Sequence, residues 1–398
     1  MKKSIAIIGG GPAAMLLAAH LNTQQFDLTI YEKNVALGRK FLVAGKGGFN
    51  LSHSENITAF IERYTPSDFL KEALLFFDNT DLQHWFKSIN IPTFVGSSKR
   101  IYPEKGIKPI EVLNAILNQL KQNKVTIKTG YHWLGWDADN NLLFKNAATV
   151  TADITIFALG GSSWKKTGSD GNWNSILKQK NLNIIPFQAS NCAYQVNWKP
   201  DFITKTEGKP LKNIAISCDN KSQKGEVIIT QFGLEGGAIY ALSPEIRTQL
   251  NEKDSAQIFI DLKPQFTAQE IANKVTSTKL TEQLSSKLKL EKAKITLLKD
   301  YLTKEQFLDI DFLAKTIKAF PLTISGTATI DEAISTVGGI DLNEIDTNFQ
   351  LKKMPNHYAI GEMLDYDAPT GGYLLQSCFS MGVFLSNFLN ESLDIETP

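Results

Sequence analysis

The chain has 398 residues, of which 42% are apolar and 21% are charged, a composition typical of a globular protein with a sizeable core. A formal net charge of +1 gives no general attraction to nucleic acid or to an anionic membrane, and no uninterrupted apolar run reaches the length of a bilayer span. The cysteines Cys192, Cys218 and Cys378 are far apart and form no Cys-x-x-Cys pair, which argues against a disulfide framework or a metal site and favours the reducing cytoplasm.

The first predicted element is a short strand that ends in a run of glycines. Residues 5–8 are an apolar Ile-Ala-Ile-Ile run, Gly9-Gly10-Gly11 follows, and residues 15–21 continue as a helix. Two lysines before a long apolar run also fit a secretory signal peptide. However, glycines weaken a signal helix, whereas in a tight turn they let the backbone approach a phosphate. We therefore expect this segment to stay in the protein.

The second predicted strand, residues 26–31, ends in an acidic residue at the position that a dinucleotide requires. The glycines follow the spacing Gly9-x-Gly11-x-x-Ala14, and Glu32 comes about 20 positions later, where a carboxylate grips ribose hydroxyls. The helix N-terminus would face the phosphates with unpaired N–H groups. The βαβ pattern thus predicts a dinucleotide-binding unit, with candidate contacts at Gly9, Gly11, Pro12, Ala13, Ala14, Glu32 and Lys33.

Two further glycine-rich segments favour FAD over NAD. A polar loop runs from Gly38-Arg39-Lys40 to the glycines of residues 45–48 and Asn50, which suits the extended ribityl and flavin of FAD. Near the C-terminus, a predicted strand at 357–360 leads to Gly361 and Glu362. The residues Gly371-Gly372-Tyr373 then open a helix whose N-terminus would stabilise the charge of reduced flavin. The added candidates are Gly38, Arg39, Lys40, Gly47, Asn50, Gly361, Glu362, Gly371, Gly372 and Tyr373.

The pattern changes between about residues 188 and 330. Short alternating apolar runs predict an antiparallel β-rich domain, and residues 265–318 have helical spacing with many lysines. No second glycine fingerprint follows a predicted strand, so NAD(P)H would serve only as a transient electron donor. We expect an α/β fold: a glutathione-reductase-type, FAD-binding Rossmann-like domain (1–187 and 331–398) interrupted by a β-barrel-like plus helical insert (188–330). The lysines singled out in the insert are Lys287, Lys289, Lys292 and Lys294.

Three sequence blocks together resemble one protein family. They are residues 38–50, residues 156–161 with 167–171, and residues 336–340 with 361–365 and 371–373. The set resembles the BaiN/YhiN-type FAD-dependent oxidoreductases, which are also described as aminoacetone-oxidase-like flavoproteins and include a ribosomal RNA dihydrouridine synthase branch. The resemblance covers nearly the whole chain and implies an interrupted FAD domain. It also implies that Gly160 and Gly161 lie under the adenosine half of FAD, and Ala158, two residues before Gly160, is a further candidate contact.

The chain departs from the larger branch of that family. The branch carries Gly-Gly-Gly-Arg-Cys-Asn where this sequence has Gly45-Lys46-Gly47-Gly48-Phe49-Asn50, and many members have asparagine at the position of Leu374. A mechanism that uses a cysteine of this loop as proton donor cannot operate here. The sequence therefore looks like a distinct subgroup.

The catalytic candidates follow the second glycine loop or open the last helix. Since flavin N5 carries the hydride, the protein needs to supply only orientation and one acid–base group. Asn50, His53 and Tyr373 are the candidates, and His53 has a suitable intrinsic pKa. A basic loop holds Lys99, Arg100, Lys105 and Lys108 and could attract an anionic substrate or an RNA backbone.

Three functions remain open from the sequence. The first is an FAD-dependent oxidoreductase acting on a small amine or an unsaturated ring bound between the FAD domain and the insert. The second is a flavoprotein that reduces uridine in ribosomal RNA, with the basic insert as its RNA-docking surface. The third is a non-catalytic flavin-binding protein. None of them calls for a metal or a membrane.

Overall fold

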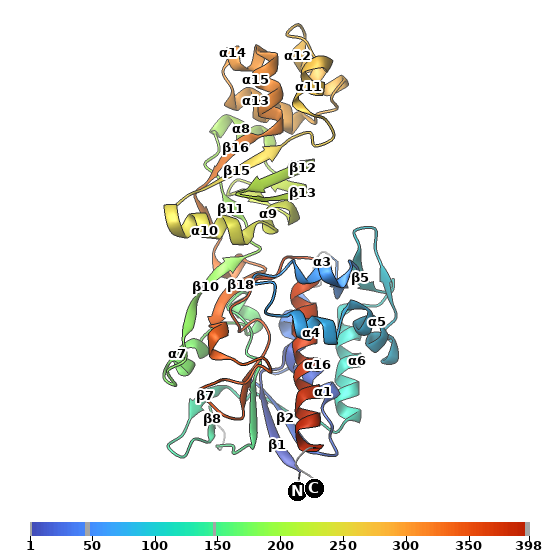
Figure 1. The fold of residues 1–398 in the computed structure, drawn as a ribbon, viewed down its shortest axis with the longest axis vertical. Coiled ribbons are helices and arrows are strands. Elements are labelled where there is room, and N and C mark those ends of the chain that lie inside the picture. The colour runs from blue at the N-terminus through green and yellow to red at the C-terminus, as the bar shows by residue number, and fades with distance from the viewer. Residues whose placement is uncertain (1, 44–47, 146–148, 395–398) are drawn as a thin grey trace. The chain divides into compact units, whose positions relative to one another are not determined.

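A computed structural model describes residues 2–43, 48–145 and 149–394. The chain forms two compact units (Figure 1). Unit 1 consists of Met1–Gln188 and Ser335–Pro398, and unit 2 of Ala189–Ile334.

Unit 1 is built on a parallel sheet with the strand order β19-β9-β1-β2-β6. Strand β1 is central, and its residues Ile5 to Ile8 are at most 2% exposed because both faces of the sheet are covered. This arrangement confirms the predicted Rossmann-like α/β class. The strands are β1 (Lys3–Ile8), β2 (Phe26–Glu32), β6 (Thr126–Thr129), β9 (Ile154–Phe157) and β19 (His357–Ala359).

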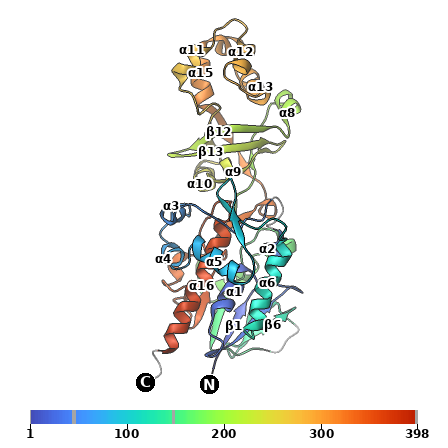
Figure 2. The ribbon, with the colours of Figure 1, turned by 90° about the vertical axis from the view of Figure 1, so that its right-hand side faces the viewer.

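Three helices of unit 1 lie side by side (Figure 2): α1 (Pro12–His20), α6 (Pro109–Gln122) and α16 (Tyr373–Asp394). Helix α1 contacts both of the others. Gly382 of α16 allows a very close approach, because a Cβ there would stand 2.6 Å from the Ala13 carbonyl oxygen. The hairpin of β7 (Trp133–Trp136) and β8 (Leu142–Phe144) packs on the sheet, where the ring centroids of Trp133 and Phe157 are 4.9 Å apart.

A small antiparallel sheet with the order β3-β5-β4 precedes α6 in the chain. Strands β10 and β18 pair separately. The remaining elements of unit 1 are α2 (Arg39–Val43), β3 (Ser52–His53), α3 (Ile57–Ile61), α4 (Lys71–Phe76), α5 (Asn79–Ser88), β4 (Thr93–Val95), β5 (Arg100–Pro103), the 3-10 helix η1 (Lys165–Thr167), α7 (Trp173–Lys178), β10 (Ile184–Ser190), β18 (Ser335–Ile340) and η3 (Leu342–Glu344).

Unit 2 has an antiparallel sheet with the order β16-β15-β12-β13-β14-β11-β17 and its own apolar core. Its strands are β11 (Tyr194–Gln195), β12 (Pro210–Cys218), β13 (Lys221–Ile229), β14 (Gly233–Glu235), β15 (Ala256–Asp261), β16 (Phe320–Ile324) and β17 (Gly326–Thr327). Its helices are α8 (Pro200–Thr206), α9 (Gly237–Tyr240), α10 (Ser243–Lys253), α11 (Ala268–Lys274), α12 (Leu280–Ser286), α13 (Lys292–Tyr301), α14 (Lys304–Leu308), α15 (Ile310–Lys318) and η2 (Ile330–Glu332).

One of the four lysines singled out in the insert is not on the surface. Lys287, Lys289 and Lys292 are exposed, but Lys294 is only 2% exposed. Its ammonium donates to the carbonyl oxygens of Lys212 (2.5 Å) and Leu262 (3.1 Å). Lys294 therefore satisfies buried backbone acceptors of unit 2 and adds nothing to the basic surface of this unit.

Candidate functional site

Two glycines in the turn after β1, Gly9 and Gly11, have different surroundings: a side chain would collide at the first and would meet no atom at the second. Gly9 has φ +106°, and a Cβ there would lie 2.3 Å from the Ala158 carbonyl oxygen. Gly11 has φ −82°, and no atom lies within 4 Å of a Cβ built on it. Gly9 is therefore required by the close contact with the loop after β9, whereas Gly11 borders open space.

Helix α1 begins directly at this open space. Gly11 is its N-cap, Pro12 is its first residue, and no acidic side chain occupies its first turn. The first-turn N–H groups have no intrahelical acceptor, and the helix dipole adds a partial positive charge. An anion would bind favourably there.

A cleft with about 1070 Å³ of empty space, part of it open to solvent, contains this turn. Its lining brings together predicted contacts that are far apart in the sequence: Gly9, Gly11, Pro12, Ala13, Glu32, Lys33, Gly38, Arg39, Lys40, Ala158, Gly160, Gly361 and Glu362. Of the other described candidates, Ala14 is buried in α1, and Asn50, His53, Gly161, Gly371, Gly372 and Tyr373 do not line the cleft. Gly47 lies outside the described residues.

Glu32, at the end of β2, is 8% exposed and faces the glycine turn. Its Oε2 accepts the Gly10 backbone N–H at 2.8 Å. Its Oε1 accepts the backbone and side-chain N–H groups of Asn34 at 2.8 and 2.6 Å. Because a carboxylate has about four acceptor positions, these bonds leave it able to accept a further donor from the cleft.

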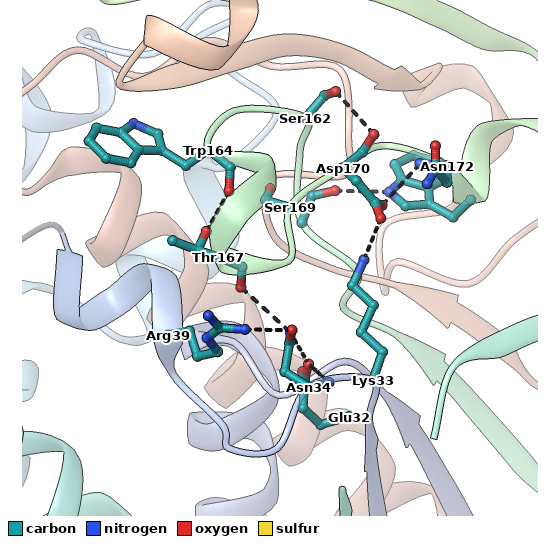
Figure 3. A network of polar contacts seen from close by, with 12 residues as sticks. Glu32, Lys33, Asn34, Arg39, Ser162, Trp164, Thr167, Ser169, Asp170 and Asn172 are labelled. Carbon is teal, nitrogen blue, oxygen red and sulfur yellow. Dashed lines mark hydrogen bonds and ion pairs between the residues drawn. The ribbon is translucent and has the colours of Figure 1, made fainter. Parts of the chain in front are cut away.

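Sequence reasoning missed the network that joins this strand end to the loop after β9 (Figure 3). Lys33 forms a 2.8 Å ion pair with Asp170. Arg39 donates to the Asn34 side-chain oxygen at 2.8 Å and to the Lys166 carbonyl oxygen at 3.1 Å. Burial would raise the pKa of Asp170, but Lys33 lowers it below its ordinary value. Lys33 and Arg39, two of the predicted cofactor contacts, are thus already paired with protein acceptors.

Lys40 is also paired with protein acceptors, on the part of the cleft wall that Glu362 forms. Its ammonium lies 2.7 Å from a carboxylate oxygen of Glu362 and 2.7 Å from the Ser163 hydroxyl. The other carboxylate oxygen of Glu362 accepts the Thr336 N–H at 3.2 Å. A Cβ on Gly161 would stand 2.1 Å from the Thr336 hydroxyl, so Gly161 allows these loops to meet without lining the cleft.

Part of the cleft wall is apolar or aromatic and was not predicted from the sequence. It includes Tyr131, Trp133, Trp173, Ile176 and Cys378. The Cys378 thiol is buried, and burial together with the nearby Glu362 carboxylate raises its pKa to about 12. Cys378 is therefore a small apolar wall residue at neutral pH, as expected for a buried cysteine.

The structure brings two of the three catalytic candidates, His53 and Tyr373, into contact. The rings of His53 and Tyr373 stack with centroids 5.3 Å apart. Asn50 lies two residues before β3, and its backbone N–H donates to the Gly48 carbonyl oxygen at 2.9 Å. The structure thus pairs His53 with Tyr373, whereas for Asn50 the contact found among the described residues is one of its backbone.

Two residues that the sequence did not reveal hold this pair. The Tyr373 hydroxyl donates to the Glu55 carboxylate, and Arg63 binds the same carboxylate through two nitrogens at 3.0 and 2.9 Å. Burial and the Glu55 carboxylate raise the pKa of Tyr373 above its ordinary value. Arg63 lies eight residues after Glu55, beyond α3, so no local spacing indicates the contact.

Among the described residues, no three His, Cys, Asp or Glu side chains gather as they would around a metal ion. Within that same part of the chain, every helix is too short or too polar to cross a bilayer.

With its glycine turn at the end of β1, the sheet of unit 1 is that of a Rossmann-type protein. The chain belongs to the HI0933-like Rossmann-domain family, whose model matches residues 3–387. That match agrees with the resemblance drawn from the sequence blocks.

Relatives in this family match over nearly the full chain. A 3-dehydro-bile acid delta(4,6)-reductase from Clostridium scindens is 25% identical and covers 95% of this chain and 97% of its own. A ribosomal RNA dihydrouridine synthase from Escherichia coli is 24% identical and covers 94% of each chain. Among solved structures, a 3-ketosteroid delta1-dehydrogenase from Sterolibacterium denitrificans is similar in fold, with a TM-score of 0.50, 11% identity, and coverage of 98% of this chain and 100% of its own. The Clostridium scindens relative is a reductase by name, and the chain is an oxidoreductase of this family.

Proposed function

We propose that the protein is an oxidoreductase that uses non-covalently bound FAD. The observation that carries the proposal is the open space at Gly11, where α1 begins, in the same cleft as the Glu32 carboxylate. A diphosphate would fit this space and accept the first-turn N–H groups of α1. Glu32 would accept the adjoining ribose hydroxyls, and the aromatic wall would pack against the adenine.

FAD is favoured over NAD because the cleft extends beyond the glycine turn. Its lining continues to Gly38, Lys40, Gly361 and Glu362, which would hold the ribityl chain. When bound, the flavin supplies hydride transfer at N5. The substrate would be an unsaturated ring or a small amine, and NAD(P)H would be a transient electron donor. The bile acid reductase among the relatives supports an unsaturated ring.

The cofactor is tested by reconstitution. Purified protein is titrated with FAD, FMN and riboflavin, and flavin fluorescence and absorbance measure binding. Since only FAD has the diphosphate and adenosine, we expect it to bind at least about a hundredfold more tightly than FMN. Equal binding of FMN, or no binding of FAD, would overturn the proposal.

The reaction class is tested next with the reconstituted protein. Flavin reduction by NADH and NADPH is timed without oxygen, and the reduced protein is then mixed with cyclohex-2-enone or with air. Rapid reoxidation by the enone without peroxide indicates a reductase. Reduction of the flavin by aminoacetone, with peroxide formation in air, indicates an oxidase.

A second candidate function is the reduction of uridine in ribosomal RNA. Two observations favour it: the name of the Escherichia coli relative, and the exposed Lys287, Lys289 and Lys292 in unit 2. Deletion of the gene should then erase a dihydrouridine from ribosomal RNA, detected by mass spectrometry of nuclease fragments. A complete nucleotide map in the deletion strain would exclude this function.

A further inference from the structure

The strands β3 and β5 present two basic side chains on one face. His53 pairs with Arg100 in the antiparallel register, so their side chains project to the same side. The neighbouring pair, Ser52 and Ile101, points to the other side and is at most 1% exposed. His53 and Arg100 are both half-buried.

This face lies against the segment that opens α16. A Cβ on Gly371 would stand 3.4 Å from Arg100 Nε, and a Cβ on Gly372 would stand 2.5 Å from the Ser52 Cα. Tyr373 stacks on the His53 ring. The two basic side chains are therefore beside the residues expected to contact the flavin.

The protein backbone fixes which nitrogen of His53 carries the proton. The Glu55 N–H donates to His53 Nδ1 at 3.2 Å, so Nδ1 must be an acceptor. A neutral imidazole with an accepting Nδ1 carries its hydrogen on Nε2, and an imidazolium would set two N–H groups against each other. His53 is thus a neutral donor through Nε2 and does not have the second proton that a general acid would release.

The charges around His53 favour the same neutral form. Burial lowers the pKa of His53, and Arg63, Arg100 and Lys99 lower it further, against the opposing Glu55 carboxylate. The other neighbours are the Tyr373 hydroxyl, which is committed to Glu55, and Asn79, whose amide donates to the His53 carbonyl oxygen. Among the described residues, neither His53 Nε2 nor the Arg100 guanidinium has a hydrogen-bond or ion-pair partner.

From this pair we infer that His53 Nε2–H and the Arg100 guanidinium form a donor site for a substrate oxygen that becomes negative during the reaction. The inference rests on the proposed function and names its substrate class: a carbonyl conjugated to a reducible C=C bond. A bound flavin would supply the hydride, and a C–H bond would form at the β-carbon of such a substrate. The electron pair of the C=C bond would move toward the carbonyl oxygen, and water would then protonate the α-carbon. The two donors stabilise the negative oxygen.

The tautomer is tested without any substrate. Protein labelled with [15N]histidine and loaded with FAD is studied by long-range 1H–15N NMR, and the His53→Gln variant assigns the resonance. We expect His53 to be neutral at pH 7 with its proton on Nε2. A proton on Nδ1, or an imidazolium at pH 7, would overturn the inference.

The donor site is tested with ligands that mimic the negative oxygen. Phenol, 4-chlorophenol and 4-nitrophenol are titrated into the FAD-loaded protein, and the long-wavelength flavin absorbance reports binding. Affinity should rise with phenol acidity, and His53→Phe and Arg100→Met should each weaken 4-nitrophenol binding by about tenfold. His53→Gln, which keeps a donor, should lose less, and the exposed control His84→Gln should match the wild type.

Failure of the inference differs from failure of the proposed function. If FAD binds and is reducible but phenol affinity is the same in His53→Phe and wild type, the donor site is refuted while the function stands. If FAD does not bind, the proposed function itself fails. Reoxidation of the reduced protein by cyclohex-2-enone but not by cyclohexene supports the substrate class, and equal rates would contradict it. Uridine as a third oxidant distinguishes a nucleobase from a carbocyclic enone.

Discussion

The Glu32 carboxylate at the end of β2 accepts the backbone N–H of Gly10 at 2.8 Å, although the two residues are 22 positions apart in the chain. This bond joins the residue expected to bind ribose to the turn expected to bind diphosphate. The two halves of the proposed nucleotide site therefore depend on one another.

We predict that Glu32→Gln weakens both the fold and FAD binding. The amide nitrogen of glutamine would face an N–H donor of Gly10 or Asn34, and an unsatisfied buried donor costs about 1–3 kcal/mol. Urea denaturation of the apoprotein and FAD titration measure the two effects. Asp27→Asn, which removes an exposed carboxylate from the same strand, is the matched control. Unchanged FAD affinity in Glu32→Gln would contradict the ribose role.

The glycine turn allows binding to be separated from folding. In Gly11→Ala the added methyl group meets no protein atom and φ is ordinary, so the apoprotein should keep its stability within about 0.5 kcal/mol. The methyl group would occupy the space of the diphosphate, and FAD affinity should fall by about tenfold or more. Gly9→Ala should instead destabilise the apoprotein, since its methyl group would overlap the Ala158 carbonyl oxygen. Wild-type FAD affinity in Gly11→Ala would show that the phosphates lie elsewhere.

The parts of the site that follow local spacing could be predicted from the sequence. Gly9, Gly11 and Glu32 belong to one βαβ unit, and a strand, a turn and a helix within about 30 residues leave a readable pattern. The parallel pairing of β1 with β2 follows from the same unit. Gly361 and Glu362 were found because a predicted strand precedes them.

The remaining contacts depend on tertiary pairing. Asp170 reaches Lys33 over 137 residues, and Tyr373 reaches Glu55 over 318 residues, so no periodicity in the sequence indicates either contact. Lys294 shows a second limit of the sequence, because a lysine in a charged helical stretch looks like its exposed neighbours although its ammonium donates to buried carbonyl oxygens. Composition alone does not distinguish a solvated lysine from a buried one.

Acid stability should depend on Glu55. Burial would raise its pKa, but hydrogen bonds from Arg63 and Tyr373 outweigh burial and hold the pKa below the ordinary value of 4.5. A lowered pKa contributes stability that is fully present above pH 4.5 and is lost as the pH falls through the folded-state value. Glu55→Gln should therefore be less stable than wild type by about 1–3 kcal/mol at pH 7, and the difference should shrink below pH 4.5.

Urea midpoints at pH 7, 5, 4 and 3.5 measure this difference. The exposed neighbour Glu62→Gln is the control, and its stability should stay within about 0.5 kcal/mol of wild type at each pH. A difference between Glu55→Gln and wild type that stays constant down to pH 3.5 would mean that the carboxylate charge contributes nothing.

The close contact of α16 with α1 should limit what position 382 tolerates. A Cβ there would lie 2.6 Å from the Ala13 carbonyl oxygen and 2.9 Å from the Leu17 nitrogen, both of which are backbone atoms. Gly382→Ala must therefore push the two helices apart, at a cost of about 1–3 kcal/mol in urea denaturation. Because α1 begins at the glycine turn, FAD affinity should fall as well. Gly11→Ala is the useful comparison, since it should lose FAD affinity without losing stability. Full stability of Gly382→Ala would mean that the helices can separate without cost and would refute the tight packing.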